Sequence, residues 1–225
     1  MNALIVVDVQ NDFMDDGALP VPGAYDVVPL ANQAMERFDI VVATQDWHPP
    51  EHGSFAANHA GHAPYERIDL HGLPQVLWPT HCVQGDDGAA FVNGLHTERF
   101  TAVFPKGTDP TVDSYSGFFD NGHRNSTGLS AWLRERGVTT VFVLGVATDF
   151  CVKYTALDAV GEGFATTLLA DACRGVDLNA GDVDAAIEEM RAAAVTISAV
   201  AELTATSSQS ALVIGLGSEQ ARSGP

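Results

Sequence analysis

Apolar residues recur along the chain with two different spacings, and these spacings predict its secondary structure. Short apolar runs, typical of buried parallel strands, occur at residues 3–9, 40–44, 102–105, 141–144, 165–170 and 195–199. Recurrence at three- and four-residue steps predicts helices at residues 25–38, about 127–136, about 151–160 and 180–194. This order predicts an α/β fold in three layers, with a mainly parallel six-stranded sheet and helices on both faces.

One apolar stretch combines a strand, a turn and a cysteine. Residues 141–144 are all apolar, Gly145 marks a turn, and Cys151 follows six residues later. Helical spacing begins at about the same place, which puts Cys151 in the first turn of a helix. Free N–H groups and the positive end of the helix dipole would favour a thiolate there, so Cys151 is a candidate nucleophile. A buried, unreactive cysteine is the alternative that this stretch alone leaves open.

Two segments depart from the strand and helix pattern. Residues 49–100 hold six of the eight histidines, many glycines and prolines, and little periodicity. A loop region of this length is usually functional or disordered. Tryptophan and histidine residues in and next to this region favour an ordered loop. Residues 204–225 are rich in Ser, Thr and Gly. We therefore expect one domain over residues 1–203, with an insertion at about 49–100, and a C-terminal tail over residues 204–225.

Composition narrows the class of protein. Apolar residues make up 46% of the 225 positions and charged residues 18%, which is typical of a globular chain. The net charge of −18 argues against nucleic acid or an anionic membrane as a partner, because both need clustered Lys and Arg. Residues 3–9 are too short an apolar run for a signal peptide and lack a basic lead-in. No apolar run approaches the roughly 20 residues of a membrane span.

The cysteines indicate a compartment. Three of them, with no CxxC pair, do not form a disulfide framework. A reducing cytoplasm is the simplest location. The sequence leaves a homo-oligomer open.

Reactive side chains occur where four of the predicted strands end. The carboxyl ends of parallel strands meet at one edge of a sheet, where open α/β folds build their sites. There a carboxylate can accept a thiol proton, an ammonium can stabilise the anion, and a thiolate can attack a carbonyl. Taken alone, each residue has a plain alternative, such as a turn residue or a solvated charge. The four positions are Asp8, Asp46, Lys106 and Cys151.

A second set of residues has the character of a metal site. Asp46, His48 and His81 are a workable donor set for Zn²⁺, Fe²⁺ or Mn²⁺, and Asp46 and His48 are spaced to share one side of an extended chain. A structural zinc site would normally use more cysteines, so an open site is expected. The other histidines of residues 49–100 lack a strand to anchor them, and surface positions are expected for most of this group, which comprises His52, His59, His62, His71 and His96.

Five sequence blocks together resemble the nicotinamidase (pyrazinamidase) branch of the isochorismatase-like cysteine hydrolases. They are ALIVVDVQNDF (3–13), QDWHP (45–49), WPTHCVQG (78–85), FPKGTDPTVDSYSGFFDN (104–121) and GVATDFCV (145–152). The first and last blocks suggest the superfamily, and the middle three single out nicotinamidases. The α/β pattern extends the resemblance to about residue 203, and residues 204–225 fall outside it.

The resemblance implies catalytic roles. Cys151 matches the nucleophile, Asp8 its base, and Lys106 the residue that orients and stabilises both. The Val146–Ala147 bond matches a non-proline cis peptide, and the N–H groups of Ala147 and Cys151 would form the oxyanion hole.

The resemblance also implies binding roles. Asp46, His48 and His81 match the ligands of one divalent metal ion. Some family members add a histidine eight residues after the ligand Asp; here Ser54 stands at that position, and a ligand bridged by water is expected instead. The aromatic wall around a pyridine ring matches Phe13, Trp78 and Tyr115. The insertion would therefore carry metal- and substrate-binding residues.

The implied reaction is hydrolysis of nicotinamide to nicotinate and ammonia through a thioester, with pyrazinamide as a further substrate. The nearest alternative is another amidase or ureidohydrolase of the same superfamily. A non-haem Fe(II) oxygenase built on Asp46, His48 and His81, and a non-catalytic binding module, are more distant alternatives. The sequence does not fix the metal, the oligomeric state or the role of the tail.

Overall fold

The computed structural model describes residues 1–203, and its centre is a six-stranded parallel sheet. The strands lie in the order β5-β2-β1-β6-β7-β8, and each hydrogen-bonded pair is parallel. Their bounds are β1 Asn2–Val7, β2 Val41–Asp46, β5 Ala102–Lys106, β6 Thr140–Val146, β7 Ala165–Arg174 and β8 Thr196–Ser198. The predicted fold class is confirmed.

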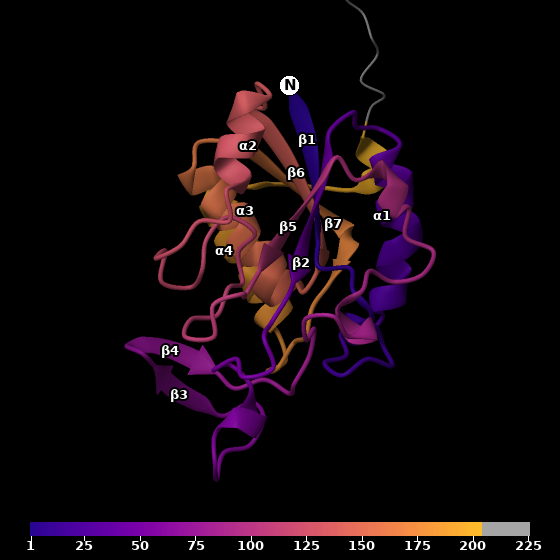
Figure 1. Cartoon of the computed structure of the whole chain (residues 1–225). Coiled ribbons are helices and arrows are strands. Elements are labelled where there is room, and N and C mark those ends of the chain that lie inside the picture. The colour runs from indigo at the N-terminus through magenta and orange to yellow at the C-terminus, as the bar shows by residue number, and fades with distance from the viewer. Residues whose placement is uncertain (204–225) are drawn as a thin grey trace, which may run out of the picture.

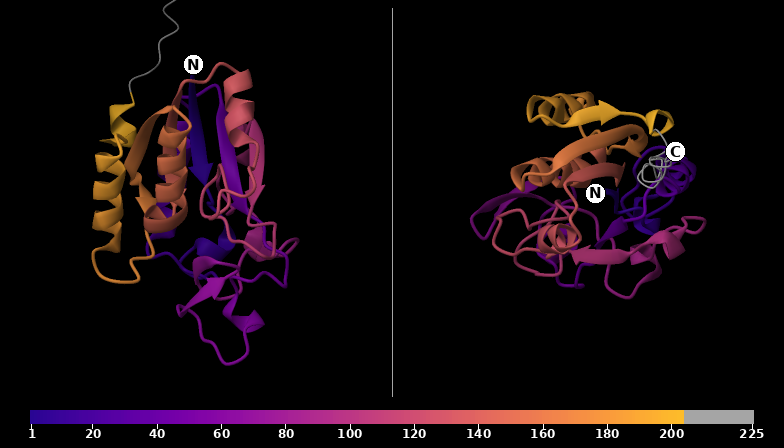
Figure 2. Two further views of the ribbon diagram at one scale, coloured as in Figure 1. Left: turned by 90° about the vertical axis from the view of Figure 1, so that its left-hand side faces the viewer. Right: turned by 90° about the horizontal axis from the view of Figure 1, so that it is seen from above.

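Helices cover both faces of this sheet (Figures 1 and 2). On one face α1, Val27–Met35, packs against β7, β1 and β6. On the other face lie α2, Leu129–Glu135, α3, Lys153–Gly161, and α4, Asp182–Ala192. Residues Ala3–Val7 of the central strand are all fully buried, as expected of a parallel strand covered on both faces. The core therefore lies on both sides of β1.

The irregular region contains a β-hairpin that the sequence pattern did not predict. β3, Arg67–Leu70, pairs antiparallel with β4, Leu73–Val76, and the pair projects from the end of the sheet where the β1 and β2 strands finish (Figure 1). Its two turn residues, His71 and Gly72, both have positive φ, 53° and 88°, as in the tight turns that join strands. Each strand is only four residues long and β4 contains a proline, so the alternating pattern is too short to recognise in the sequence.

Among the described residues, no helix is both long enough and apolar enough to cross a membrane. The predicted tail, residues 204–225, lies outside the described residues, and the division of the chain into a domain and a tail stays a prediction.

Gly145 provides a test of how tightly the central strands pack. It has φ of +127°, and a Cβ there would lie 2.1 Å from the Val7 carbonyl oxygen on β1. Gly145→Ala is therefore expected to lower the free energy of unfolding by at least about 2 kcal/mol, through strain and the clash. Urea and thermal unfolding measure the effect.

Gly161 is the matched control, because a Cβ there meets no atom within 4 Å. As the last residue of α3, Gly161→Ala is expected to be neutral or to stabilise by up to about 1 kcal/mol. Equal stability of the two variants would contradict the close approach of β6 to β1.

Candidate active site

Four predicted side chains meet at the carboxyl edge of the sheet. Asp8 directly follows β1, Asp46 ends β2 and Lys106 ends β5. Cys151 lies in a π-helical turn, Thr148–Val152, that connects β6 to α3. The Val146–Ala147 bond before this turn is cis, as the resemblance implied. Parallel strands thus bring together residues that are up to 143 positions apart in the chain.

The Lys106 ammonium is at the centre of this group. Its Nζ lies 2.9 Å from Asp8 Oδ2 and 3.4 Å from Cys151 Sγ, and it donates to Asp46 Oδ1 and, at 2.9 Å, to the Ser114 carbonyl. The Lys106 side chain is completely buried, which rules out the alternative of a solvated surface charge. Two carboxylates compensate the buried ammonium, as such a charge requires.

The pKa values of the two carboxyl groups, those of Asp8 and Asp46, are shifted in opposite directions. Burial raises the pKa of Asp8, and the opposing effect of Lys106 does not cancel it. Burial also acts to raise the pKa of Asp46, but Lys106 and His48 outweigh it and hold that pKa well below its usual range. The same carboxylates keep the pKa of Lys106 well above its usual range despite burial. Two carboxyl groups with separated pKa values indicate different tasks, and Asp8 is the one suited to accept a proton.

The position of Cys151 at a helix start led us to expect a thiolate, and the direction of its pKa shift corrects this expectation. Burial raises this pKa well above the ordinary value; Lys106 opposes the rise, while Asp8 and Asp46 add to it. The raised pKa therefore comes first from burial, with a further contribution from the two carboxyl groups. The thiol needs a base when it reacts, and a carboxylate oxygen of Asp8 lies within 4.8 Å of Cys151 Sγ.

The three predicted metal ligands form a buried group beside Lys106. Asp46 Oδ2 lies 3.6 Å from His48 Nε2 and 3.7 Å from His81 Nε2. Each histidine Nδ1 donates to a backbone carbonyl, that of Gly107 at 2.9 Å and that of Pro79 at 2.7 Å. A carbonyl only accepts, so the lone pair of each neutral ring is on Nε2, where it can bind a metal ion. Two oriented imidazoles and a carboxylate fit a divalent ion of the zinc or iron class.

His52 departs from the surface position expected for most histidines of the insertion. It is fully buried, and its ring lies 4.3 Å from that of His48. The Ser54 N–H donates to His52 Nδ1, and the Ser54 hydroxyl lies 2.7 Å from the same atom. Burial lowers the pKa of His52 to about 4, so the ring is neutral near pH 7. Since Ser54 is bonded to His52, a role for Ser54 at the metal through water stays a prediction.

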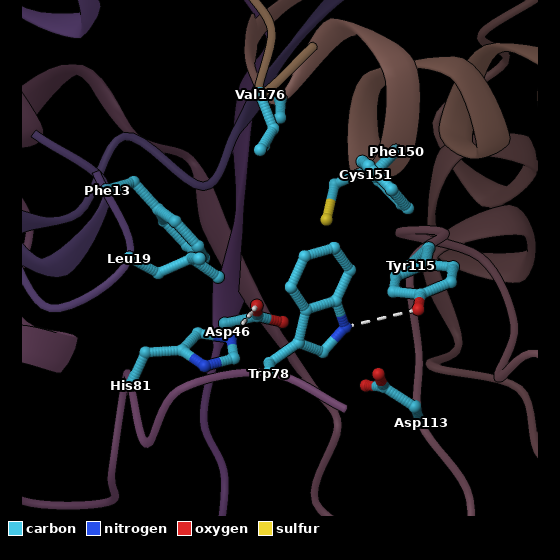
Figure 3. A pocket seen from close by; sticks show the side chains of 11 residues that line it. Phe13, Leu19, Asp46, Trp78, His81, Asp113, Tyr115, Phe150, Cys151 and Val176 are labelled. Atoms are coloured by element: carbon cyan, nitrogen blue, oxygen red, sulfur yellow. Dashed lines mark hydrogen bonds and ion pairs between the residues drawn. The ribbon is translucent and has the colours of Figure 1, made fainter. Parts of the chain in front are cut away.

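A pocket with an empty volume of about 360 Å³ opens onto the candidate nucleophile Cys151 and onto the candidate metal ligands Asp46 and His81. Figure 3 shows the Cys151 sulfur pointing into it above the indole of Trp78, with Asp46 and His81 on the lower side. The predicted ring-binding residues are in the lining, together with residues that the sequence pattern did not single out, Leu19, Asp113, Phe150 and Val176.

Hydrogen bonds fix the aromatic wall of this pocket. The Tyr115 hydroxyl accepts from Trp78 Nε1 at 3.2 Å and from Gln75 Nε2 at 3.3 Å. Gln75 also donates to Asp113 at 2.8 Å, so the hairpin strand β4 is tied to the wall. Trp78 and Phe150 meet edge to face, with ring centroids 4.9 Å apart. The pocket is therefore preformed, with two polar ends and apolar sides.

The model of the isochorismatase domain matches residues 2–202 of the chain. The chain belongs to the isochorismatase family. It is 47% identical over 204 residues to the nicotinamidase of Escherichia coli K12, a match that covers 89% of this chain and 95% of the relative.

Two solved structures show the same fold. An Acinetobacter baumannii nicotinamidase/pyrazinamidase matches with a TM-score of 0.88 and 47% identity, over 90% of this chain and 98% of that one. The pyrazinamidase of Pyrococcus horikoshii, solved in complex with zinc, matches with a TM-score of 0.73 and 39% identity, over 88% and 98% of the two chains. The predicted family resemblance is confirmed.

Gly107 tests how closely the backbone must approach the metal group. It has φ of +65°, and a Cβ there would lie 2.3 Å from His48 Cε1. Gly107→Ala is expected to displace the His48 ring and weaken Zn²⁺ binding by about 10- to 100-fold, the usual loss when a ligand's support is removed. Competition with a chromophoric chelator measures the affinity.

Gly72→Ala is the control, because Gly72 has a similar φ of +88° and no atom within 4 Å of its Cβ position. It shares the backbone strain without the clash. Loss of zinc affinity of the same size in both variants would argue against the contact with His48.

Cys151 should be the first cysteine to react with a small alkylating reagent. It lines the pocket, whereas Cys82 and Cys173 are buried outside that lining, with burial raising the pKa of Cys173 to about 12. Since the thiolate reacts and the pKa of Cys151 is raised, the rate of iodoacetamide labelling is expected to increase with pH. Peptide mass spectrometry identifies the site, and labelling of Cys82 or Cys173 at the same rate would contradict the assignment.

Proposed function

We propose that the protein is a metal-dependent cysteine amidohydrolase that converts nicotinamide to nicotinate and ammonia, and that it also accepts pyrazinamide. One observation carries the proposal: Cys151 and the metal-ligand candidates Asp46 and His81 line the same pocket. A pyridine carboxamide has two polar groups that suit these two ends. The relatives' names, nicotinamidase and nicotinamidase/pyrazinamidase, support this substrate class.

The pocket would hold the substrate by its ring. Phe13, Trp78 and Tyr115 provide apolar and aromatic walls for a pyridine. Asp46, His48 and His81 would hold Zn²⁺, Fe²⁺ or Mn²⁺, which when bound supplies a Lewis-acid partner for the ring nitrogen. A substrate held in this way would have its carboxamide next to Cys151, so the contribution of the metal site would be orientation.

The residues around Lys106 would carry the chemistry. Asp8 accepts the thiol proton as Cys151 Sγ attacks the carboxamide carbon, and Lys106 stabilises the negative charge. The N–H groups of Ala147 and Cys151 are proposed as the oxyanion hole. Asp8 returns the proton to the leaving nitrogen, the C–N bond breaks, and ammonia leaves a thioester. Water, deprotonated by Asp8, then attacks the thioester and releases nicotinate and the thiol.

An ammonia-release assay on nicotinamide, with the metal content of the same sample, tests the proposal. Cys151→Ala is expected to lower kcat by at least about 10³-fold, as for other nucleophile deletions, and to keep its metal. Cys173→Ala is the control and should retain turnover. Undiminished turnover by Cys151→Ala would remove the nucleophile from the mechanism.

His81→Ala tests metal binding independently of the nucleophile, because His81 faces Asp46 Oδ2 while Lys106 contacts Oδ1. It should lose metal and raise KM sharply, while Cys151 still reacts with iodoacetamide. A panel of carbamoyl substrates covers the alternative: turnover of these without nicotinamide hydrolysis would indicate another amidase of the family.

A further inference from the structure

Gln10 lies two residues after Asp8, and the proposed reaction gives it no role. It is completely buried, and its side-chain amide makes three hydrogen bonds. Oε1 accepts from the Asp46 N–H at 2.8 Å, and Nε2 donates to the carbonyls of Asp46 at 2.8 Å and Ala89 at 2.9 Å. The amide therefore pairs with both backbone polar groups of Asp46.

The course of the strands explains why these bonds matter. The paired register of β1 and β2 ends at Val6 and Ala43, and Asp8 turns away with φ of +50°. Asp46 is three residues further along β2, beyond the last residue of β1. On its other side, β2 remains paired with β5 up to Asp46 and Lys106. The Gln10 side chain thus takes the place of the missing β1 backbone, because an amide side chain offers the same donor and acceptor as a peptide group.

We propose that Gln10 is a positioning residue that fixes Asp46 for two simultaneous tasks. Asp46 Oδ2 faces His48 and His81, and Oδ1 pairs with Lys106. A shift of the Asp46 backbone moves both oxygens together. Without Gln10, the buried N–H and C=O of Asp46 lose their partners, which is costly enough to displace the strand end or admit water. That the Asp46 group binds a metal ion rests on the proposed function.

Gln45 is a matched control on the neighbouring position of β2. Its Nε2 donates to the same Ala89 carbonyl, at 2.9 Å, but among the described residues its side chain makes no hydrogen bond to Asp46. Gln10→Met and Gln45→Met both replace an amide by an apolar side chain of similar length. They differ in whether Asp46 loses its backbone partners.

The experiment compares Zn²⁺ affinity and thermal stability of the two variants and the unaltered protein. Apo-protein is titrated with Zn²⁺ against a chromophoric chelator, and the melting temperature of the apo-protein is measured separately. Gln10→Met is expected to raise the Kd for Zn²⁺ by about 10- to 100-fold, and Gln45→Met by less than about 3-fold. The kcat/KM of Gln10→Met for nicotinamide, relative to that of the unaltered protein, should be higher at saturating Zn²⁺ than at limiting Zn²⁺.

Gln10→Glu provides a second test if Gln10→Met does not fold. It keeps the side-chain shape and an acceptor for the Asp46 N–H, and removes the donor to the Asp46 carbonyl. A folded Gln10 variant with the Kd of the unaltered protein would overturn the proposal, as would an equal rise in Kd for Gln10→Met and Gln45→Met, which would indicate a general packing effect.

The outcome is separable from that of the proposed function. If the unaltered protein binds Zn²⁺ but releases no ammonia from nicotinamide, the proposed reaction fails while the comparison of Kd values still decides the role of Gln10. If the unaltered protein binds no Zn²⁺, Fe²⁺ or Mn²⁺, the role proposed for Gln10 fails.

Discussion

A single carboxylate, that of Asp46, is shared between a buried ammonium and two imidazoles. One oxygen pairs with Lys106 and the other faces His48 and His81. A buried lysine is stable only when its charge is compensated, so Asp46 cannot move toward the histidines without weakening the pair with Lys106. The candidate metal ligands and Cys151 are consequently held at a fixed separation. In the proposed function, a substrate that must reach both would be selected by that separation.

The charge balance around Lys106 also explains the resting state of the thiol. Asp46 is the stronger acid of the pair and neutralises Lys106, while burial raises the pKa of Asp8. The pKa of Cys151 is raised for the same reasons, burial and nearby carboxylates. A pre-formed thiolate would add an anion to a buried site that already contains two carboxyl groups. In the proposed reaction, proton transfer to Asp8 during attack would avoid that cost and would make the same carboxyl group available as an acid for the leaving nitrogen.

The sequence predicted the features that depend on local pattern and on the geometry of parallel sheets. Apolar runs located the six strands, and polar residues at strand ends located Asp8, Asp46, Lys106 and Cys151. The β3–β4 hairpin was missed because its strands are only four residues long and β4 contains a proline. The burial of His52 was missed because it depends on contacts with Ser54 and His48. The direction of the Cys151 pKa shift was missed because it depends on burial in the folded chain and on carboxyl groups from distant strands. The spacing of apolar residues along the sequence carries no information about such contacts.

The segment after β1 explains how an irregular region can hold ligands in place. Asp8 contacts Lys106, and Gln10 binds the backbone of Asp46. Asp12 Oδ2 accepts from the Cys82 N–H at 2.7 Å, which fixes the residue next to His81. Phe13 meets the His81 ring edge to face, with centroids 5.5 Å apart. His81 is carried by a loop without regular strand pairing, so its position depends on such side-chain contacts. One short segment thus contacts Lys106, Asp46 at the end of a strand and the loop that carries His81. In the proposed enzyme, this segment would align the catalytic and metal-binding residues although they come from separate parts of the chain.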